Sequence, residues 1–175
     1  MRAVVYLELL QEAEDREHLS PSDLRPVSPI DLQNIETEVG MPLPVAYTEF
    51  LCDVGPGTEH GGLARWYHID ITRAGNVIDA SRCLMSDQIK AMRADGIDPT
   101  NYPQDMLVIY DACDGTVCGF LPDITLGSYQ EAVFSWDCDD FILTQVADSF
   151  SDFLDYLNDL DIVSFDASEF KALLT

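Results

Sequence analysis

The sequence predicts a single α+β domain, in which a central, mainly antiparallel sheet is flanked by helices on its N-terminal and C-terminal sides. Two capped helix patterns lie between residues 28 and 55, and four short apolar segments separated by turn residues follow between residues 106 and 144. A third capped helix pattern begins at Ser149. Helices grouped apart from a run of strands joined by short turns are typical of α+β folds. A chain of 175 residues with 47% apolar residues can bury one core, and is short for two.

The first of these helices has clear end signals. Ser28 is a candidate N-cap, Pro29 suits the first helical position and Gly40 suits the C-terminal end. Asp31, three residues after the serine, can complete the cap. One side of the predicted helix is apolar and carries Leu32, Ile35 and Val39.

A second helix is predicted from Pro44 to Gly55, because its apolar residues recur at helical spacing. These are Tyr47, Phe50, Leu51 and Val54. The same reasoning gives a helix after Ser149 and Asp152, with Phe150, Phe153, Leu154 and Leu157 on one face and Asp152, Asp155 and Asp159 on the other.

The remaining elements are shorter. Helices are expected at 3–17, 83–94 and 166–174, and strands at 63–71, 106–110, 117–121, 133–136 and 141–144. Both faces of the 106–110 segment are apolar, which predicts a central strand covered on each side. We expect one core to unite Tyr47, Phe50, Leu107, Ile109, Trp136, Phe150 and Phe153. Residues 1–27, a helix and a Ser/Pro-rich loop, are predicted to precede a domain of residues 28–175.

The charge of the chain is strongly negative and unevenly distributed. Its 32 acidic and 9 basic residues give a formal charge of −23, and Lys171 is the only basic residue after Arg93. Such a field repels phosphate backbones and anionic membranes, and it attracts basic protein surfaces. We therefore expect no direct binding to nucleic acid or membranes. A solvated surface that serves only solubility is the simpler alternative.

The cysteines and the N-terminus indicate a reducing compartment. Five cysteines form no CxxC pair, which favours buried free thiols over zinc or disulfides. No signal peptide is recognisable, and no segment approaches the ~20 apolar residues of a membrane span. A cytoplasmic protein without metal or cofactor, monomeric or weakly dimeric, is expected.

Catalytic motifs are not found in the sequence. The three histidines form no HExxH or HxH arrangement, and there is no GxSxG, P-loop or GxGxxG. We therefore predict a binding protein that has no catalytic residues.

Two carboxylate clusters are the only candidate site: Asp111 and Asp114 before a glycine, and Asp137, Asp139 and Asp140 after a tryptophan. Aspartates in turns commonly cap backbone amides, so plain turn chemistry is one explanation. Contact with a partner is a second, and a Ca²⁺ or Mg²⁺ site is a third, although neither cluster has calcium-loop spacing. If the two turns lie at the same end of neighbouring strands, all five carboxylates share one small surface.

The order of these segments resembles that of the SUKH superfamily, a group named for a fungal cell-wall-assembly regulator and abundant among bacterial immunity proteins. The family's I…E…LG…LP…Y..FL…G opening is matched by Ile35, Glu36, Val39, Gly40, Leu43, Pro44, Tyr47, Phe50, Leu51 and Gly55. Later motifs are similar: the strand before Gly115, the V-x-x-W-D segment at Val133–Asp137, and the A-x-S-F-x-x-F segment at Ala147–Phe153. The DCDD loop after Trp136 and residues 1–27 depart from the pattern.

The resemblance implies an α+β fold without catalytic residues. It also implies an immunity protein that binds and occludes a cognate toxin, and the acidic charge suits a toxin with a basic surface, such as a nuclease or another effector directed at nucleic acids or nucleotides. A non-enzymatic regulatory or scaffolding adaptor, as among the fungal relatives, is the alternative. A metal-dependent enzyme using the aspartate clusters is a third.

Overall fold

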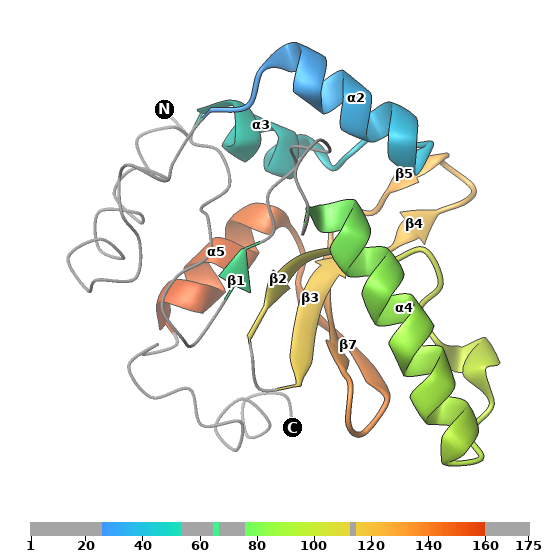
Figure 1. The fold of residues 1–175 in the computed structure, drawn as a ribbon. Coiled ribbons are helices and arrows are strands. Elements are labelled where there is room, and N and C mark those ends of the chain that lie inside the picture. The colour runs from blue at the N-terminus through green and yellow to red at the C-terminus, as the bar shows by residue number, and fades with distance from the viewer. Residues whose placement is uncertain (1–25, 54–64, 67–75, 113–114, 160–175) are drawn as a thin grey trace.

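A five-stranded antiparallel sheet organises the part of the chain that the computed structural model describes, residues 26–53, 65–66, 76–112 and 115–159 (Figure 1). In spatial order its strands are β1 (Arg65–Trp66), β2 (Leu107–Asp111), β3 (Thr116–Phe120), β6 (Val133–Asp137) and β7 (Ile142–Ala147). A separate small hairpin consists of β4 (Pro122–Asp123) and β5 (Ser128–Tyr129). The predicted α+β fold is confirmed. The predicted helices at 3–17 and 166–174, and most of the strand predicted at 63–71, lie outside the described residues.

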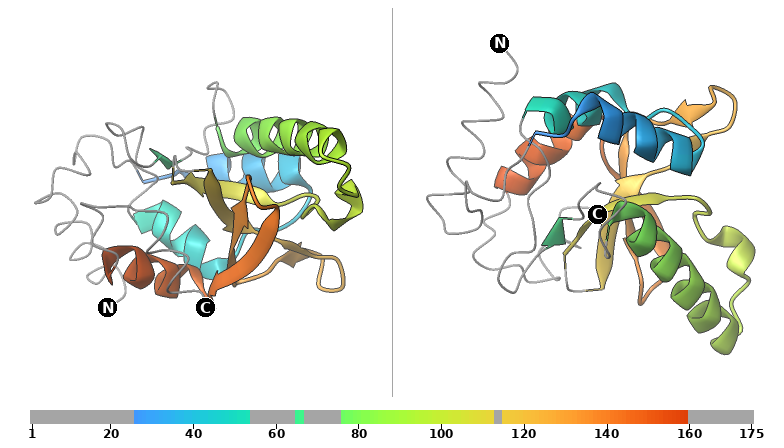
Figure 2. Two further views of the ribbon diagram at one scale, coloured as in Figure 1. Left: turned by 90° about the horizontal axis from the view of Figure 1, so that it is seen from below. Right: turned by 45° about the horizontal axis from the view of Figure 1, so that its top comes forward.

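Helices cover both faces of this sheet. Figure 2 shows α4 on one side of the strands and α3 and α5 on the other. The helical elements are α2 (Pro29–Val39), α3 (Val45–Asp53), α4 (Val77–Ala94), the short 3₁₀ helix η2 (Pro99–Asn101) and α5 (Phe150–Asp159). This arrangement explains why β2 is apolar on both faces, because its residues Leu107 to Tyr110 are all buried.

The predicted helix ends are confirmed where the capping residues were clear. The Ser28 Oγ accepts a hydrogen bond from the Asp31 amide at 3.3 Å and donates one to the Asp31 carboxylate at 2.6 Å. Gly40 ends α2 with a left-handed φ of 79°, a conformation that costs glycine least. Ser149 and Asp152 form the same pair of bonds at the start of α5.

Helix α4 begins six residues earlier than the predicted 83–94 segment. The side chain of Asn76 accepts hydrogen bonds from the amides of Ile78 and Asp79 at 2.9 and 3.1 Å, so it is the N-cap. The β-branched residues Val77 and Ile78 that follow have modest helix propensity. They are buried against the core, and this tertiary packing supports the first turn.

The core is divided by the sheet, and the prediction of one core was wrong for Trp136. Trp136 lies with Met92, Tyr102, Met106, Val108 and Val117 in a cluster under α4. The other six predicted core residues (Tyr47, Phe50, Leu107, Ile109, Phe150 and Phe153) lie together on the opposite face. An aromatic group dominates that second cluster, in which the ring centroids of Tyr47 and Phe150 are 4.8 Å apart.

Close contact between β2 and β3 restricts position 119 to glycine. A Cβ atom on Gly119 would lie 2.1 Å from the carbonyl oxygen of Leu107 and 3.0 Å from the Cα of Val108. Both are backbone atoms, which cannot rotate away. The register between the strands shifts at this point, between Val108 and Tyr110. The bulge therefore brings the backbones together where no side chain can be accommodated.

Replacing Gly119 with alanine is expected to lower the free energy of unfolding by about 3 kcal/mol, because the β2 and β3 backbones must separate. Gly96→Ala is the control. Gly96 has a φ of 75° and open space around it, so that change adds only backbone strain of about 1 kcal/mol. Urea unfolding of both variants measures the difference, and equal losses would contradict the steric explanation.

The division of the core predicts which substitutions act independently. Trp136→Phe and Phe150→Leu are expected to have additive effects on unfolding free energy, within about 0.5 kcal/mol, because they lie on opposite faces of the sheet. Tyr47→Leu and Phe150→Leu change neighbouring rings and are expected to couple by about 0.5 kcal/mol or more. Two double-mutant cycles by chemical denaturation measure both values. Strong coupling between positions 136 and 150 would contradict the two-cluster description.

Candidate partner-binding surface

Two hairpin turns lie side by side at one end of the sheet. One joins β2 to β3 and the other joins β6 to β7, and the strands β3 and β6 are neighbours, with Thr116 opposite Asp137. The Cys138 amide donates a hydrogen bond to the Gly115 carbonyl at 2.8 Å, which ties the turns together. A Cβ on Gly115 would lie only 3.1 Å from the Asp139 carboxylate. The two turns therefore lie at the same end of neighbouring strands, which is the condition stated above for the carboxylates to share one surface.

The three aspartates of the β6–β7 turn have different environments. The Asp137 Oδ1 accepts hydrogen bonds from the amides of Asp139 and Asp140, both at 2.9 Å. Asp137 therefore shapes the turn, as aspartates commonly do. Asp139 and Asp140 are exposed, whereas Asp137 is half-buried. The turn presents two carboxylates outward and uses a third to hold its own backbone.

The end of this turn is anchored to the core beneath α4. Phe141 has a φ of 56°, a left-handed conformation unusual for an aromatic residue. Its ring packs 6.3 Å from that of Trp136 and belongs to the edge of that cluster. Packing thus offsets the backbone strain, which is of the order of 1 kcal/mol. The position of the acidic turn is fixed by the hydrophobic core beneath it.

The other two predicted site residues, Asp111 and Asp114, do not belong to the β6–β7 turn. Asp111 is the last residue of β2 rather than a turn residue, and it is half-buried. It lies opposite Arg65 of β1, so a basic residue neighbours it in the sheet. Asp114 lies outside the described residues. The structure therefore brings Asp111, Asp137, Asp139 and Asp140 to the same end of the sheet, where Asp139 and Asp140 are exposed.

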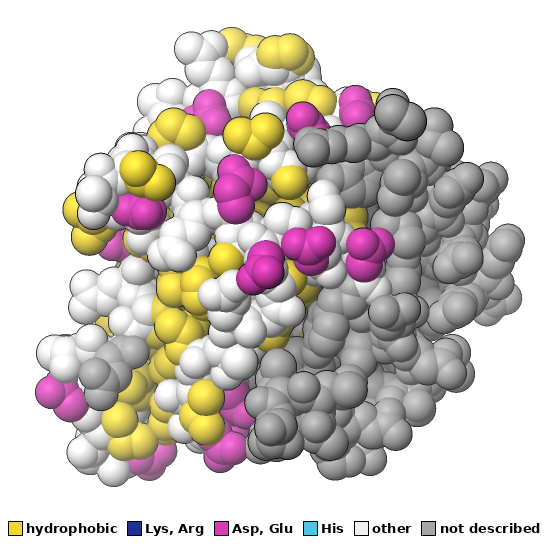
Figure 3. Space-filling model, turned by 180° about the vertical axis from the view of Figure 1, so that it is seen from behind, with side chains coloured by type: hydrophobic (Ala, Val, Ile, Leu, Met, Phe, Trp, Pro, Cys, Tyr) yellow, Lys and Arg dark blue, Asp and Glu magenta, His cyan; other side chains and the backbone are white. Residues whose placement is uncertain are grey.

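Most of the basic residues in the described ranges lie on one helix. Within the described ranges, Arg82, Lys90 and Arg93 all lie on α4, and Arg65 is the remaining basic residue. The opposite face, shown in Figure 3, has acidic and apolar side chains but no basic one among the residues described. None of the described residues of β3, β6, β7 and the turn between β6 and β7 is basic, so this part of the sheet carries a negative formal charge.

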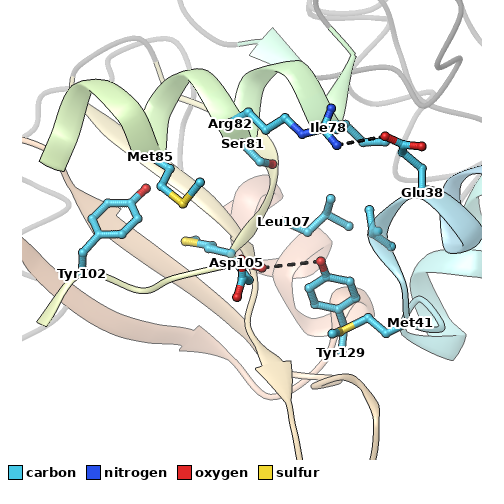
Figure 4. Close-up of a pocket in the computed structure, with 12 residues that line it drawn as sticks. Glu38, Met41, Ile78, Ser81, Arg82, Met85, Tyr102, Asp105, Leu107 and Tyr129 are labelled. Atoms are coloured by element: carbon cyan, nitrogen blue, oxygen red, sulfur yellow. Dashed lines mark hydrogen bonds and ion pairs between the residues drawn. The ribbon is translucent and has the colours of Figure 1, made fainter. Parts of the chain in front are cut away.

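A pocket lies at the other end of the sheet, between α2, α4 and the segment that leads into β2 (Figure 4). Its volume is about 360 Å³, and its lining includes the apolar residues Met41, Met85, Ile78 and Leu107. The exposed ion pair between Arg82 and Glu38, at 2.9 Å, spans its rim. Surface pairs of this kind contribute little stability. The sequence did not reveal the pocket, because its lining comes from segments that are far apart along the chain.

Two tyrosines add hydroxyl groups to this pocket. The Tyr129 hydroxyl donates a long hydrogen bond of 3.5 Å to the Asp105 carbonyl oxygen. Burial, with a smaller contribution from the Asp105 charge, raises the pKa of Tyr129 to about 12. Burial also raises the pKa of Tyr102. Both hydroxyls therefore stay protonated near neutral pH. The lining can hold an apolar or amphipathic side chain, and it contains no histidine or cysteine.

The cysteines are less buried than predicted. Cys52, Cys83, Cys118 and Cys138 form no disulfide, but only Cys118 is buried, and Cys83 is exposed on α4. Cys113 lies outside the described residues. Among the residues that the structure describes, no group of three or more His, Cys, Asp or Glu is arranged to hold a metal ion. In the same ranges, no helix combines the length and the apolar composition needed to cross a bilayer.

The fold and its motifs define a SUKH-type α+β domain, and comparison with family models agrees. The chain belongs to the SMI1 / KNR4 family (SUKH-1), whose model matches residues 26–156. This match covers all the described helices and strands except the end of α5. Among the curated proteins compared with this chain, none is significantly similar to it.

The role of Asp137 in the turn can be separated from its charge. Asp137→Ala is expected to lower the unfolding free energy by about 1 kcal/mol, because the amides of Asp139 and Asp140 lose their acceptor. Asp137→Asn keeps an acceptor and is expected to cost less. Asp139→Asn is the control for charge and is expected to change stability little. Thermal or urea unfolding measures all three variants, and equal losses for alanine and asparagine at position 137 would contradict the capping role.

Proposed function

We propose that this protein is a cytoplasmic immunity protein, which binds a cognate toxin and covers its active site without catalysing a reaction. The observation that carries the proposal is the acidic hairpin end, where Asp137, Asp139 and Asp140 lie beside the β2–β3 turn. Membership of the SMI1 / KNR4 family supports a binding role. The toxin is one with a basic cleft, such as a nuclease or another effector directed at nucleic acids or nucleotides.

Two physical properties of this surface suit rapid capture of a basic protein. First, its turns are tied to each other and to the core, so little conformational entropy is lost on binding. Second, the net charge of −23 produces a long-range field that accelerates encounter with a positively charged partner. An inhibitor that must act before the toxin does benefits directly from a fast association rate.

A regulatory or scaffolding adaptor is the second candidate, and the pocket beside α4 favours it. A cavity of about 360 Å³ lined by methionines can accept an apolar side chain from a protein partner. Such a contact does not require a toxin. A metal-dependent enzyme receives no support from the described residues.

Co-purification distinguishes these candidates. The full-length chain is expressed in its native cell with an affinity tag, and the captured proteins are identified by mass spectrometry. A toxin encoded by the adjacent gene is the expected partner, and co-expression of this chain is expected to restore growth to cells that produce it. Capture of a non-toxic partner, together with no effect on the adjacent gene product, would favour the adaptor.

Charge-dependent capture predicts a specific kinetic change. The triple variant Asp137→Asn, Asp139→Asn and Asp140→Asn is expected to associate with the captured partner more slowly, and its rate is expected to depend less on salt. The matched control replaces Asp152, Asp155 and Asp159 with asparagine, which removes the same charge from α5. Stopped-flow association rates against ionic strength measure both variants. Identical salt dependence for the two would show that the hairpin end is not the binding surface.

A further inference from the structure

The strand β7 has a free edge. It is the last strand in the spatial order of the sheet, and along its inner edge it pairs with β6 from Ile142 to Ala147. Nothing else in the described ranges pairs with its outer edge. An antiparallel edge strand directs the N–H and C=O groups of every second residue away from the sheet. These groups are positioned to bond an added strand.

The edge of β7 is unusually unprotected. Monomeric proteins commonly guard an edge strand with charged residues, prolines, bulges or short length. The other edge strand, β1, is short and contains Arg65. By contrast, β7 has the sequence ILTQVA, without charge or proline, and its one bulge lies near its end, at Val146. The residues from Ile142 to Gln145 therefore form a regular, uncharged edge.

Apolar side chains at this edge are exposed on both sides of the strand. Ile142 is 54% and Leu143 38% exposed, and as successive residues of a strand they point to opposite faces. Leu143 lies opposite Trp136 in the register with β6. It therefore extends the apolar surface of the hydrophobic cluster around Trp136 to the edge of the sheet. An added strand would find apolar contacts above and below the plane of the sheet.

Charge decides which partner fits. Asp139 and Asp140 precede β7, Asp148 follows it, and all three are exposed. A second copy of this chain carries the same charge of −23 and is repelled, whereas a segment with lysine or arginine is attracted. We propose that the free edge of β7 binds an extended, basic segment of a partner protein as a sixth strand of the sheet. This inference rests on the proposed function, because that function supplies the basic partner.

In this mode of binding, backbone hydrogen bonds hold the segment and its side chains determine its position. Apolar residues of the segment contact Ile142 and Leu143. Basic residues at one end lie beside Asp139 and Asp140. The acidic turn and the strand edge then act as one continuous surface.

A designed peptide tests the inference on the full-length chain. The probe is a nine-residue peptide in which valine and threonine alternate between terminal pairs of lysine. Its control is the same peptide N-methylated at every second amide, which keeps the charge and side chains but blocks one hydrogen-bonding edge. When the probe is present at low millimolar concentration, we expect the hydrogen-exchange rates of alternate β7 amides to fall at least tenfold. The methylated peptide is expected to bind at least tenfold more weakly than the probe. NMR hydrogen exchange and titration measure these effects.

Matched protein variants test the apolar contacts. The double variant Ile142→Gln and Leu143→Gln is expected to bind the probe at least fivefold more weakly. The control, Ile124→Gln and Leu126→Gln, makes the same chemical change at the exposed tip of the β4–β5 hairpin and is expected to have no effect.

The outcomes separate this inference from the proposed function. Absence of protection along β7, or equal binding of the two peptides, would overturn the added strand. If the hairpin aspartates still determined the salt dependence of toxin capture, the proposed function would stand. Conversely, protection of β7 combined with capture of a non-toxic partner and no effect on the adjacent gene product would refute the proposed function and leave the strand edge as a binding site for basic segments.

Discussion

The pairing of β3 with both of its neighbours is the constraint on which the rest of the structure depends. On one side β3 approaches β2 so closely at Gly119 that no side chain fits between the backbones. On its other side it pairs with β6 from Thr116 to Gly119. This double pairing separates the two hydrophobic clusters and places the β2–β3 and β6–β7 turns next to each other. The acidic surface therefore follows from the order of the strands.

The sheet also gives its two ends different chemical properties. At the hairpin end, short turns present carboxylates on a rigid frame, and Phe141 connects the β6–β7 turn to the cluster around Trp136. At the opposite end, α2 and α4 diverge around a pocket lined by methionines and tyrosines. Since the two sites share the strands between them but no residue, each can be altered by substitution while the other is preserved.

Local signals in the sequence predicted the elements with clear ends. Ser28 and Gly40 set the limits of α2, and Ser149 set the start of α5, because capping depends on residues within one turn of the helix.

The start of α4 was missed, since the Asn76 cap is followed by β-branched residues whose burial becomes apparent only in three dimensions. The strands β4 and β5 were missed because two residues are too few to show a period. The prediction that Trp136 shares one core with the other apolar residues was wrong, because alternation along a strand does not show which face a given residue occupies when bulges shift the register. For the candidate site, the sequence identified the acidic residues, but only the strand order showed that the two turns adjoin.

The residues of the β6–β7 turn have different roles, and this difference affects how the sequence of such a protein can diverge. Asp137 and Phe141 maintain the backbone path, through hydrogen bonds and core packing respectively, whereas the side chains of Asp139 and Asp140 between them are exposed. Selection for folding acts most strongly on the two flanking positions, whose side chains hold the turn in place. Under the proposed function, a lineage can therefore acquire a new target by exchanging two neighbouring codons, with the scaffold inherited unchanged.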